Sequence, residues 1–149
     1  MRLTKQTNYA IRILMYCATN NESLSRISEI AKSYSTSELF MFKILPPLVE
    51  HGFIKTTRGR NGGITLAKAP NKITLADVIK VTEENFALSE CLATEEMDCP
   101  LINSCGLKQA LSTALNAFFD SLNKVTLADL IDKKYNLKKR LKICNNDNE

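Results

Sequence analysis

Three cysteines lie close together in one acidic stretch of the chain, at Cys91, Cys99 and Cys105. Three thiols are an odd number for disulfide bonds, and zinc ribbons usually hold their metal with closely spaced pairs of cysteines, which this stretch lacks. Iron-sulfur clusters accept thiolates at looser spacings, so a cluster is the leading interpretation and three unrelated thiols in a loop are the alternative. Cys17 differs, because it lies in an apolar helical pattern typical of a buried residue, and Cys144 lies in a polar tail.

The charges of the chain are divided sharply along its length. Residues 1–82 carry twelve Lys and Arg against five Asp and Glu, and residues 83–105 carry six Asp and Glu and no Lys or Arg. Residues 106–149 carry eight Lys and Arg against five Asp and Glu. A basic N-terminal half indicates a polyanion partner, although a solvated face can produce the same asymmetry.

The length and hydropathy of the chain limit the classes of protein to consider. No stretch approaches the ~18 apolar residues of a membrane span, and charges stand where a signal peptide has its apolar run. We therefore expect a cytoplasmic protein without a membrane partner, in which thiols are reduced or bound to metal. The 149 residues fit one ordinary domain, or one domain with an extension that depends on a partner.

The N-terminal half predicts a helix-turn-helix. A first helix over 4–19 has apolar residues at helical spacing and an N-cap threonine, and a short second helix follows over about 27–34. Ser37 can cap a third, recognition helix over 38–51. A kink or restart is expected at Pro46-Pro47, because an interior proline removes a backbone donor.

Two short strands are predicted after the helix-turn-helix, over residues 53–57 and 64–66. They are joined by Arg58-Gly59-Arg60-Asn61-Gly62-Gly63, and Asn-Gly between strands is a strong hairpin signal. A helix-turn-helix followed by a hairpin with a basic tip is a winged helix, whose arginines can enter a narrow minor groove. A surface hairpin without such a role is the alternative.

The C-terminal half predicts further helices. The hexapeptide over 74–79 recurs nearly intact over 126–131, and each copy begins with a threonine followed three residues later by an aspartate, a capping-box variant. Residues 107–124 form a long amphipathic pattern, whose apolar stripe is too large for the rest of this small chain to cover and therefore predicts a two-fold dimer. The sequence beyond residue 131 is rich in Lys and Asn.

Together these patterns predict a mainly α fold with a small β-hairpin. A winged helix-turn-helix DNA-binding domain is expected over 1–82, a cysteine-containing cluster-binding loop over 83–105, a dimerisation helix region over 106–131, and a disordered tail over 132–149.

Several motifs also occur together in a specific combination. They are the opening Met1-Arg2-Leu3-Thr4, the run Asn8-Tyr9-Ala10-Ile11-Arg12, the turn Gly59-Arg60-Asn61-Gly62-Gly63, and three cysteines before a long helix. Over residues 1 to about 131, this combination resembles the bacterial winged-helix regulators that bind iron-sulfur clusters, among them a nitric-oxide-sensitive repressor. Cys99-Pro100-Leu101 and Ser104-Cys105-Gly106-Leu107 look most like the rhizobial iron regulator of that family.

The resemblance implies a repressor of iron-uptake genes that binds double-stranded operator DNA as a homodimer, with one cluster, 4Fe-4S, in each subunit. It assigns the cluster to Cys91, Cys99 and Cys105. No fourth ligand carries over, because this chain has Asn8 and Lys108 where relatives place an aspartate or a histidine. An iron without a protein ligand could be lost when free iron falls, which would release the loop and weaken DNA binding. The alternatives for the fourth position are Glu84, Glu90, Glu95, Glu96, Asp98, water or hydroxide, or a small thiol.

DNA contacts are predicted on three elements. On the recognition helix we expect base contacts, in which Glu38 could accept from a cytosine amino group and Phe40 could pack on a thymine methyl. Phosphate contacts are expected at the first helix. The predicted contacts are Ser37, Glu38, Phe40 and Lys43 on the recognition helix, Thr4, Lys5 and Arg12 on the first helix, and Arg58, Arg60, Asn61 and Gly62 on the wing.

Two other functions compete with iron sensing. An exposed iron also reacts with nitric oxide and oxygen, so a nitric-oxide or redox sensor is the alternative within the same class. A cluster carrier or assembly protein is the alternative from another class, and the basic winged helix argues against it. An enzyme is not expected, because the chain has one histidine, no paired catalytic carboxylates in a defined frame and no phosphate-binding loop.

Overall fold

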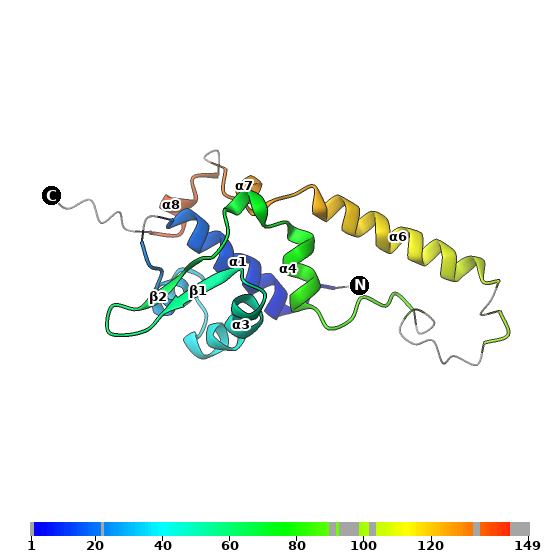
Figure 1. Cartoon of the computed structure of the whole chain (residues 1–149), viewed down its shortest axis with the longest axis horizontal. Helices are drawn as coiled ribbons and strands as arrows, with labels where there is room; N and C mark the ends of the chain where they lie inside the picture. Colours follow the sequence, from blue (N-terminus) through cyan, green and yellow to red (C-terminus); the bar gives the residue numbers. More distant parts are fainter. Residues whose placement is uncertain are drawn as a thin grey trace.

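Helices make up most of the fold, and one small antiparallel hairpin lies at their side (Figure 1). The computed structural model describes residues 2–21, 23–89, 92, 99–101, 104–132 and 135–143. This architecture confirms the mainly α class with a small β-hairpin. The elements are α1 (Lys5–Thr19), α2 (Ile27–Ser33), α3 (Glu38–Glu50), β1 (Ile54–Thr57), β2 (Gly63–Leu66), η1 (Pro70–Lys72), α4 (Leu75–Thr82), α6 (Gly106–Asn123), α7 (Leu127–Leu130) and α8 (Leu137–Arg140).

Hydroxyl caps set the starts of α1 and α3, as the sequence predicts. The Thr4 hydroxyl accepts from the backbone N–H of Thr7 at 3.2 Å, and the Ser37 hydroxyl accepts from that of Phe40 at 3.2 Å. Each bond satisfies one of the donors that a helix start leaves unpaired. The recognition helix therefore begins at a defined residue, which fixes the side chains of its first turn.

A kink or a restart was expected at Pro46-Pro47, and α3 continues through both prolines without a restart. Two interior prolines cost several kcal/mol of helix stability, at roughly 3 kcal/mol each. The inner face of the same helix compensates, because Ile44 and Leu48 are fully buried and Leu45 is 9% exposed. Burial of such side chains contributes roughly 1.5–3 kcal/mol each, so tertiary packing outweighs the local preference.

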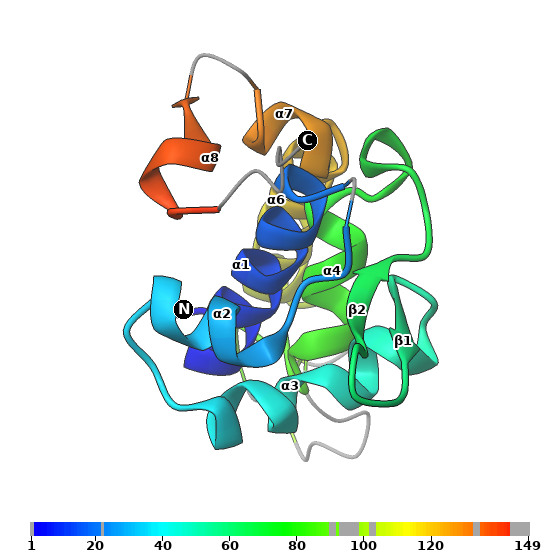
Figure 2. The ribbon, with the colours of Figure 1, turned by 90° about the vertical axis from the view of Figure 1, so that its left-hand side faces the viewer.

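The hydrophobic core surrounds α1, which crosses the middle of the body (Figure 2). Ala10, Ile13 and Leu14 of this helix have no exposed surface, and Cys17 is 2% exposed, as predicted for a small buried residue. The strands β1 and β2 pair from Ile54 opposite Leu66 to Thr57 opposite Gly63. Strand β2 also pairs with the chain before α2 through Ser25 and Ile64, which attaches the wing to the helix-turn-helix.

The two copies of the repeated hexapeptide lie side by side. Both begin with a capping box, as predicted, and Thr74 and Thr126 form an antiparallel bridge. The backbone N–H of Leu75 donates to Val125 at 2.9 Å, and that of Leu127 donates to Ile73 at 2.8 Å. This pairing, which the repeat alone did not predict, joins the end of α6 to the body.

Residues 135–143, within the tail predicted to be disordered over 132–149, form defined structure. They include α8 and pack beside α2, where the Ser33 hydroxyl donates to the carbonyl oxygen of Leu141 at 2.8 Å. Leu141 is 8% exposed and belongs to the core, with Leu137 and Ile143 packed against it. Three apolar residues at close spacing thus anchor a segment whose composition is otherwise basic. Residues 144–149, with Cys144, lie outside the described part of the chain.

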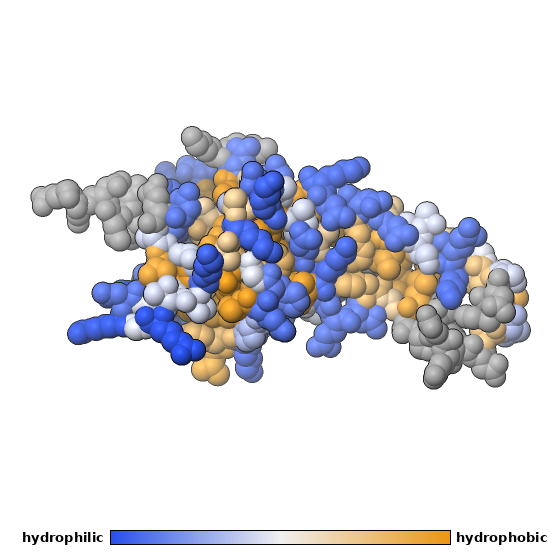
Figure 3. Space-filling model, viewed as in Figure 1, coloured by the Kyte–Doolittle hydropathy of each residue, from blue (hydrophilic) through white to orange (hydrophobic). Residues whose placement is uncertain are grey.

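The long helix α6 spans the predicted amphipathic segment and projects from the body (Figure 1). Although its stripe is apolar, none of its residues is buried. Figure 3 shows hydrophobic surface along α6 in addition to that over the body. Among the described residues, no helix is long and apolar enough to cross a membrane.

Candidate DNA interface and cysteine segment

The start of the recognition helix presents both polar and apolar side chains. Ser37, Glu38 and Lys43 are exposed, so the positions predicted to contact bases are accessible. Phe40 differs from them, because it is half-buried and its ring packs edge-on against that of Tyr9, with 5.3 Å between centroids. The packing of Phe40 joins α3 to α1, and its ring is less accessible than the other side chains predicted to contact bases.

Two cations of α1 are held against aromatic rings beside α3. The Lys5 ammonium lies 5.1 Å from the centroid of Phe40, and the Arg12 guanidinium lies 4.8 Å from that of Tyr9 and 5.5 Å from that of Tyr34. Such contacts stabilise a cation by roughly 0.5–1 kcal/mol at exposed sites. They hold both charges next to the start of α3.

A half-buried phenol supports the same aromatic cluster. The Tyr34 hydroxyl donates to the carbonyl oxygen of Arg12 at 3.1 Å. Burial raises the pKa of Tyr34 to about 12, although the Arg12 guanidinium acts in the opposite direction. The phenol therefore stays protonated at physiological pH and keeps its donor role, which holds α2 against α1.

The tip of the wing is basic and narrow. Arg58, Arg60 and Asn61 are exposed. The turn is closed by a hydrogen bond from the N–H of Gly62 to the carbonyl oxygen of Gly59 at 2.9 Å, and Gly59 has a φ of 111°. A Cβ on Gly62 would collide with the carbonyl oxygen of Thr57. The two glycines thus let the tip turn tightly, and the arginines project from it.

Two of the three predicted cluster cysteines lie within the described residues. Cys99 and Cys105 are half-exposed free thiols. Cys105 is the N-cap of α6, and its sulfur accepts from the backbone N–H of Lys108 at 3.4 Å. Cys91 and four alternative ligands, Glu90, Glu95, Glu96 and Asp98, lie outside the described residues.

The accessible thiols suit a thiolate ligand set, whereas the buried one does not. Burial raises the pKa of Cys17 to about 12, which keeps this thiol protonated. The described residues do not by themselves bring together three or more His, Cys, Asp or Glu side chains that could hold a metal ion. Asn8 and Glu84 are exposed and Lys108 is half-buried. The donors Cys99 and Cys105 thus fit an iron-sulfur cluster in type and accessibility.

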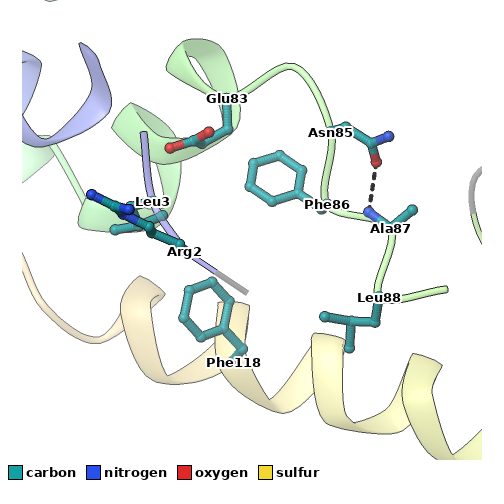
Figure 4. A pocket seen from close by; sticks show the side chains of 8 residues that line it. All are labelled: Arg2, Leu3, Glu83, Asn85, Phe86, Ala87, Leu88 and Phe118. Carbon is teal, nitrogen blue, oxygen red and sulfur yellow. Dashed lines mark hydrogen bonds between the residues drawn. The ribbon is translucent and has the colours of Figure 1, made fainter. Parts of the chain in front are cut away.

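An open pocket of about 280 Å³ lies between the N-terminus, the start of the cysteine segment and α6 (Figure 4). One wall includes Phe118 of α6, and Phe86 packs edge-on against Phe119 with 4.9 Å between centroids. Beside the pocket, the backbone N–H of Thr4 donates to the Glu83 carboxylate at 2.6 Å. This bond ties the first helix of the DNA-binding domain to the segment that leads to the cysteines. The pocket is lined by Arg2, Leu3, Glu83, Asn85, Phe86, Ala87, Leu88 and Phe118.

Two exposed apolar residues of α3 were not among the predicted DNA contacts. Leu39 is 74% exposed and Phe42 is 54% exposed. Helical periodicity could have identified them, because they lie opposite the buried Met41, Ile44 and Leu48. They add an apolar element to a surface predicted to be polar.

Comparisons with known proteins agree with this geometry. A family model described as an iron-dependent transcriptional regulator, Rrf2, matches residues 3–133. Protein aau3 of Rhizobium meliloti is 60% identical over 131 residues, which are 88% of this chain and 85% of that protein. The transcriptional regulator NsrR of Bacillus licheniformis is 43% identical over 142 residues, which are 95% of this chain and 99% of that protein.

A solved structure shows the same fold. The structure of CymR, the global cysteine regulator of B. subtilis, superposes with a TM-score of 0.72 at 24% identity, over 89% of this chain and 98% of that one. NsrR and CymR are named as regulators and not as enzymes, in agreement with the sequence. The match to nearly the whole chain shows that this protein belongs to the Rrf2 family of transcriptional regulators.

Proposed function

We propose that the chain is a cytoplasmic, iron-responsive repressor of iron-uptake genes, whose binding to operator DNA depends on an iron-sulfur cluster held by Cys91, Cys99 and Cys105. The carrying observation is that the segment leading to two half-exposed thiols is hydrogen-bonded, through Glu83, to the first helix of a winged helix. The family description as iron-dependent supports the same reading. Membership of a regulator family also favours it over a cluster carrier.

DNA binding is assigned to the basic face of the body. Ser37, Glu38 and Lys43 are exposed at the start of α3 and would contact base edges in the major groove. Lys5 and Arg12 would contact phosphates beside it, and Arg58 and Arg60 would follow a minor groove from the wing. The body thus combines base reading with charge neutralisation.

The acting form is a homodimer paired through α6. The helix has an apolar stripe and no buried residue, which leaves that stripe for a second copy to cover. Two recognition helices on one face of DNA read half-sites about 34 Å apart, one helical turn. A second copy therefore fixes the spacing that operator binding requires.

The cysteine segment can influence DNA binding through the start of α1. When bound, a cluster would cross-link the three cysteines and restrain the segment 91–105 at the N-terminal end of α6. Glu83 begins the chain toward that segment and accepts a hydrogen bond from Thr4, the N-cap of α1. A hundredfold change in operator affinity needs about 2.7 kcal/mol of coupling between the two sites.

Anaerobic purification and a DNA-binding titration test the proposal. The chain has no Trp and four Tyr, so its own ultraviolet absorbance is weak. A band near ~400 nm would come from the cluster, because protein side chains do not absorb visible light. Operator duplexes would be selected by the purified protein from a random pool. A chelator added without oxygen should remove the band and weaken binding at least a hundredfold. Equal affinity before and after the loss of colour would contradict cluster dependence.

Nitric-oxide or redox sensing is the second candidate, favoured by 43% identity to a regulator named NsrR and by the half-exposed thiols. The two signals separate in one experiment. Iron sensing is supported if a low concentration of chelator releases the protein from the operator and one equivalent of a nitric-oxide donor or of oxygen releases it only slowly. The reverse order supports the second candidate.

A further inference from the structure

The outer face of the recognition helix carries an apolar pair at its start. Leu39 and Phe42 are 74% and 54% exposed, and they stand three residues apart on the face opposite the core. Exposed Glu38 and Lys43 flank them in sequence. The pair is therefore an apolar patch within a polar and charged surface.

The exposed pair contributes little to the stability of the fold. Large apolar side chains stabilise a protein when they leave water, and most of the surface of Leu39 remains in contact with it. Figure 3 shows hydrophobic surface at the lower edge of the molecule, over α3, beside hydrophilic side chains of the wing. Two cations, Lys43 and Lys5, and one carboxylate, that of Glu38, lie near this patch. Their net positive charge suits a ligand that is anionic in its backbone and apolar at selected points.

Double-stranded DNA has that chemistry. The first turns of a recognition helix contact base edges in the major groove, where the thymine C5-methyl is the apolar group among hydrogen-bond donors and acceptors. Residues three apart on a helix are separated by about 4.5 Å along its axis, compared with about 3.4 Å for one base step. Leu39 and Phe42 can thus reach the methyl groups of neighbouring base pairs.

We propose that Leu39 and Phe42 determine operator specificity by packing on thymine methyl groups. The inference rests on the proposed DNA-binding function and deepens it. Lys5, held over Phe40, and the exposed Lys43 supply the positive charge that favours DNA over an apolar protein partner on this face. Of the two phenylalanines near the start of α3, Phe42 has this role, because the ring of Phe40 packs against that of Tyr9.

Replacement of thymine by deoxyuridine tests the proposal, because it removes the methyl group and retains the base-pairing groups. A selected operator would be compared with duplexes in which single thymines of each half-site are deoxyuridine, using the cluster-loaded protein without oxygen. Loss of one contacted methyl should weaken binding about fourfold. Phe42→Ala should bind the thymine operator more weakly, and its affinity should no longer fall at the deoxyuridine that affects the unsubstituted protein. Leu39→Ala should do the same at a neighbouring position.

Two matched variants control the experiment. Val49→Ala removes another exposed apolar side chain of α3, distant from the helix start, and should retain full sensitivity to deoxyuridine. Arg60→Ala should weaken binding to both DNAs equally. Wild-type binding that is indifferent to every deoxyuridine, or Phe42→Ala that keeps full sensitivity, overturns the inference and leaves the proposed function intact. Failure of the cluster-loaded protein to select any duplex overturns the proposed function and the inference with it.

Discussion

The winged-helix body and the arm, which is α6 together with Cys99 and Cys105, differ in how far their side chains are buried. In the body, Leu14, Ile30 and Ile44 have no exposed surface. In the arm, α6 buries none of its residues, and Leu107 is 62% exposed. The body is thus stabilised by its own core, whereas the apolar stripe of α6 and the thiols of Cys99 and Cys105 stay accessible.

The cysteines follow the same division. Cys17 lies in the body, where burial raises its pKa and keeps it an inert thiol. Cys99 and Cys105 lie in the arm and are half-exposed. Reactivity of a cysteine depends on access and on thiolate formation, so the position in the fold separates one buried, unreactive thiol from two accessible ones.

The largest expected effect on stability comes from the core of the body. Leu14→Ala should lower the free energy of unfolding by about 2–5 kcal/mol, because it leaves a cavity in a fully buried site. Leu107→Ala should have an effect that appears only as protein concentration rises, because the proposed second copy would cover that residue. Urea unfolding of the cluster-free protein at several concentrations measures both. A loss below about 1 kcal/mol for Leu14→Ala would contradict a self-supporting core.

Removal of a ligating thiol should abolish function and spare the body. Cys105→Ala and Cys99→Ala should lose the visible absorbance band and weaken operator binding at least a hundredfold, about 2.7 kcal/mol. Far-ultraviolet circular dichroism should stay unchanged. Cys17→Ala is the matched control and should keep the band. A coloured Cys105→Ala protein beside a colourless Cys17→Ala protein would reverse the assignment.

A charge in the apolar stripe of α6 should weaken the dimer. Leu111→Glu places a carboxylate on a half-buried position of the stripe and should raise the dimer dissociation constant at least tenfold, about 1.4 kcal/mol. Asn116→Glu adds the same charge at an exposed position of the helix and should leave the dimer intact. Sedimentation equilibrium distinguishes the 16.7 kDa monomer from its dimer. Equal dissociation constants would show that α6 does not pair the subunits.

The smallest expected effect is at the tip of the wing. Arg60→Ala should weaken operator binding several-fold and make the slope of log K against log salt shallower by roughly 0.9, the value for one phosphate contact. The absorbance spectrum should not change, because the wing is part of the body. Binding titrations between low and moderate salt measure the slope. An unaltered slope in both Arg60→Ala and Arg58→Ala would place the wing away from DNA.

The sequence by itself determined most elements of the body and the burial of Cys17. Hydroxyl caps at Thr4 and Ser37, apolar periodicity and the basic glycine-rich turn are local signals, and each acts within a few residues of its own position. The apolar pattern around Cys17 likewise predicted a buried thiol. Local rules suffice where a structure is decided by neighbours in the chain.

Only the tertiary structure decided which outer residues of α3 are accessible and where the tail packs. Phe40 and Phe42 are the same residue type, yet Tyr9 covers the first and leaves the second exposed. The packing of Leu141 on α2 and the pairing of Thr74 with Thr126 join residues far apart in the chain. Contacts of this kind depend on which surfaces meet after the helices have assembled, and the core around α1 supplies the burial energy that overrides the helix-breaking tendency of Pro46-Pro47 and the polar composition of the tail.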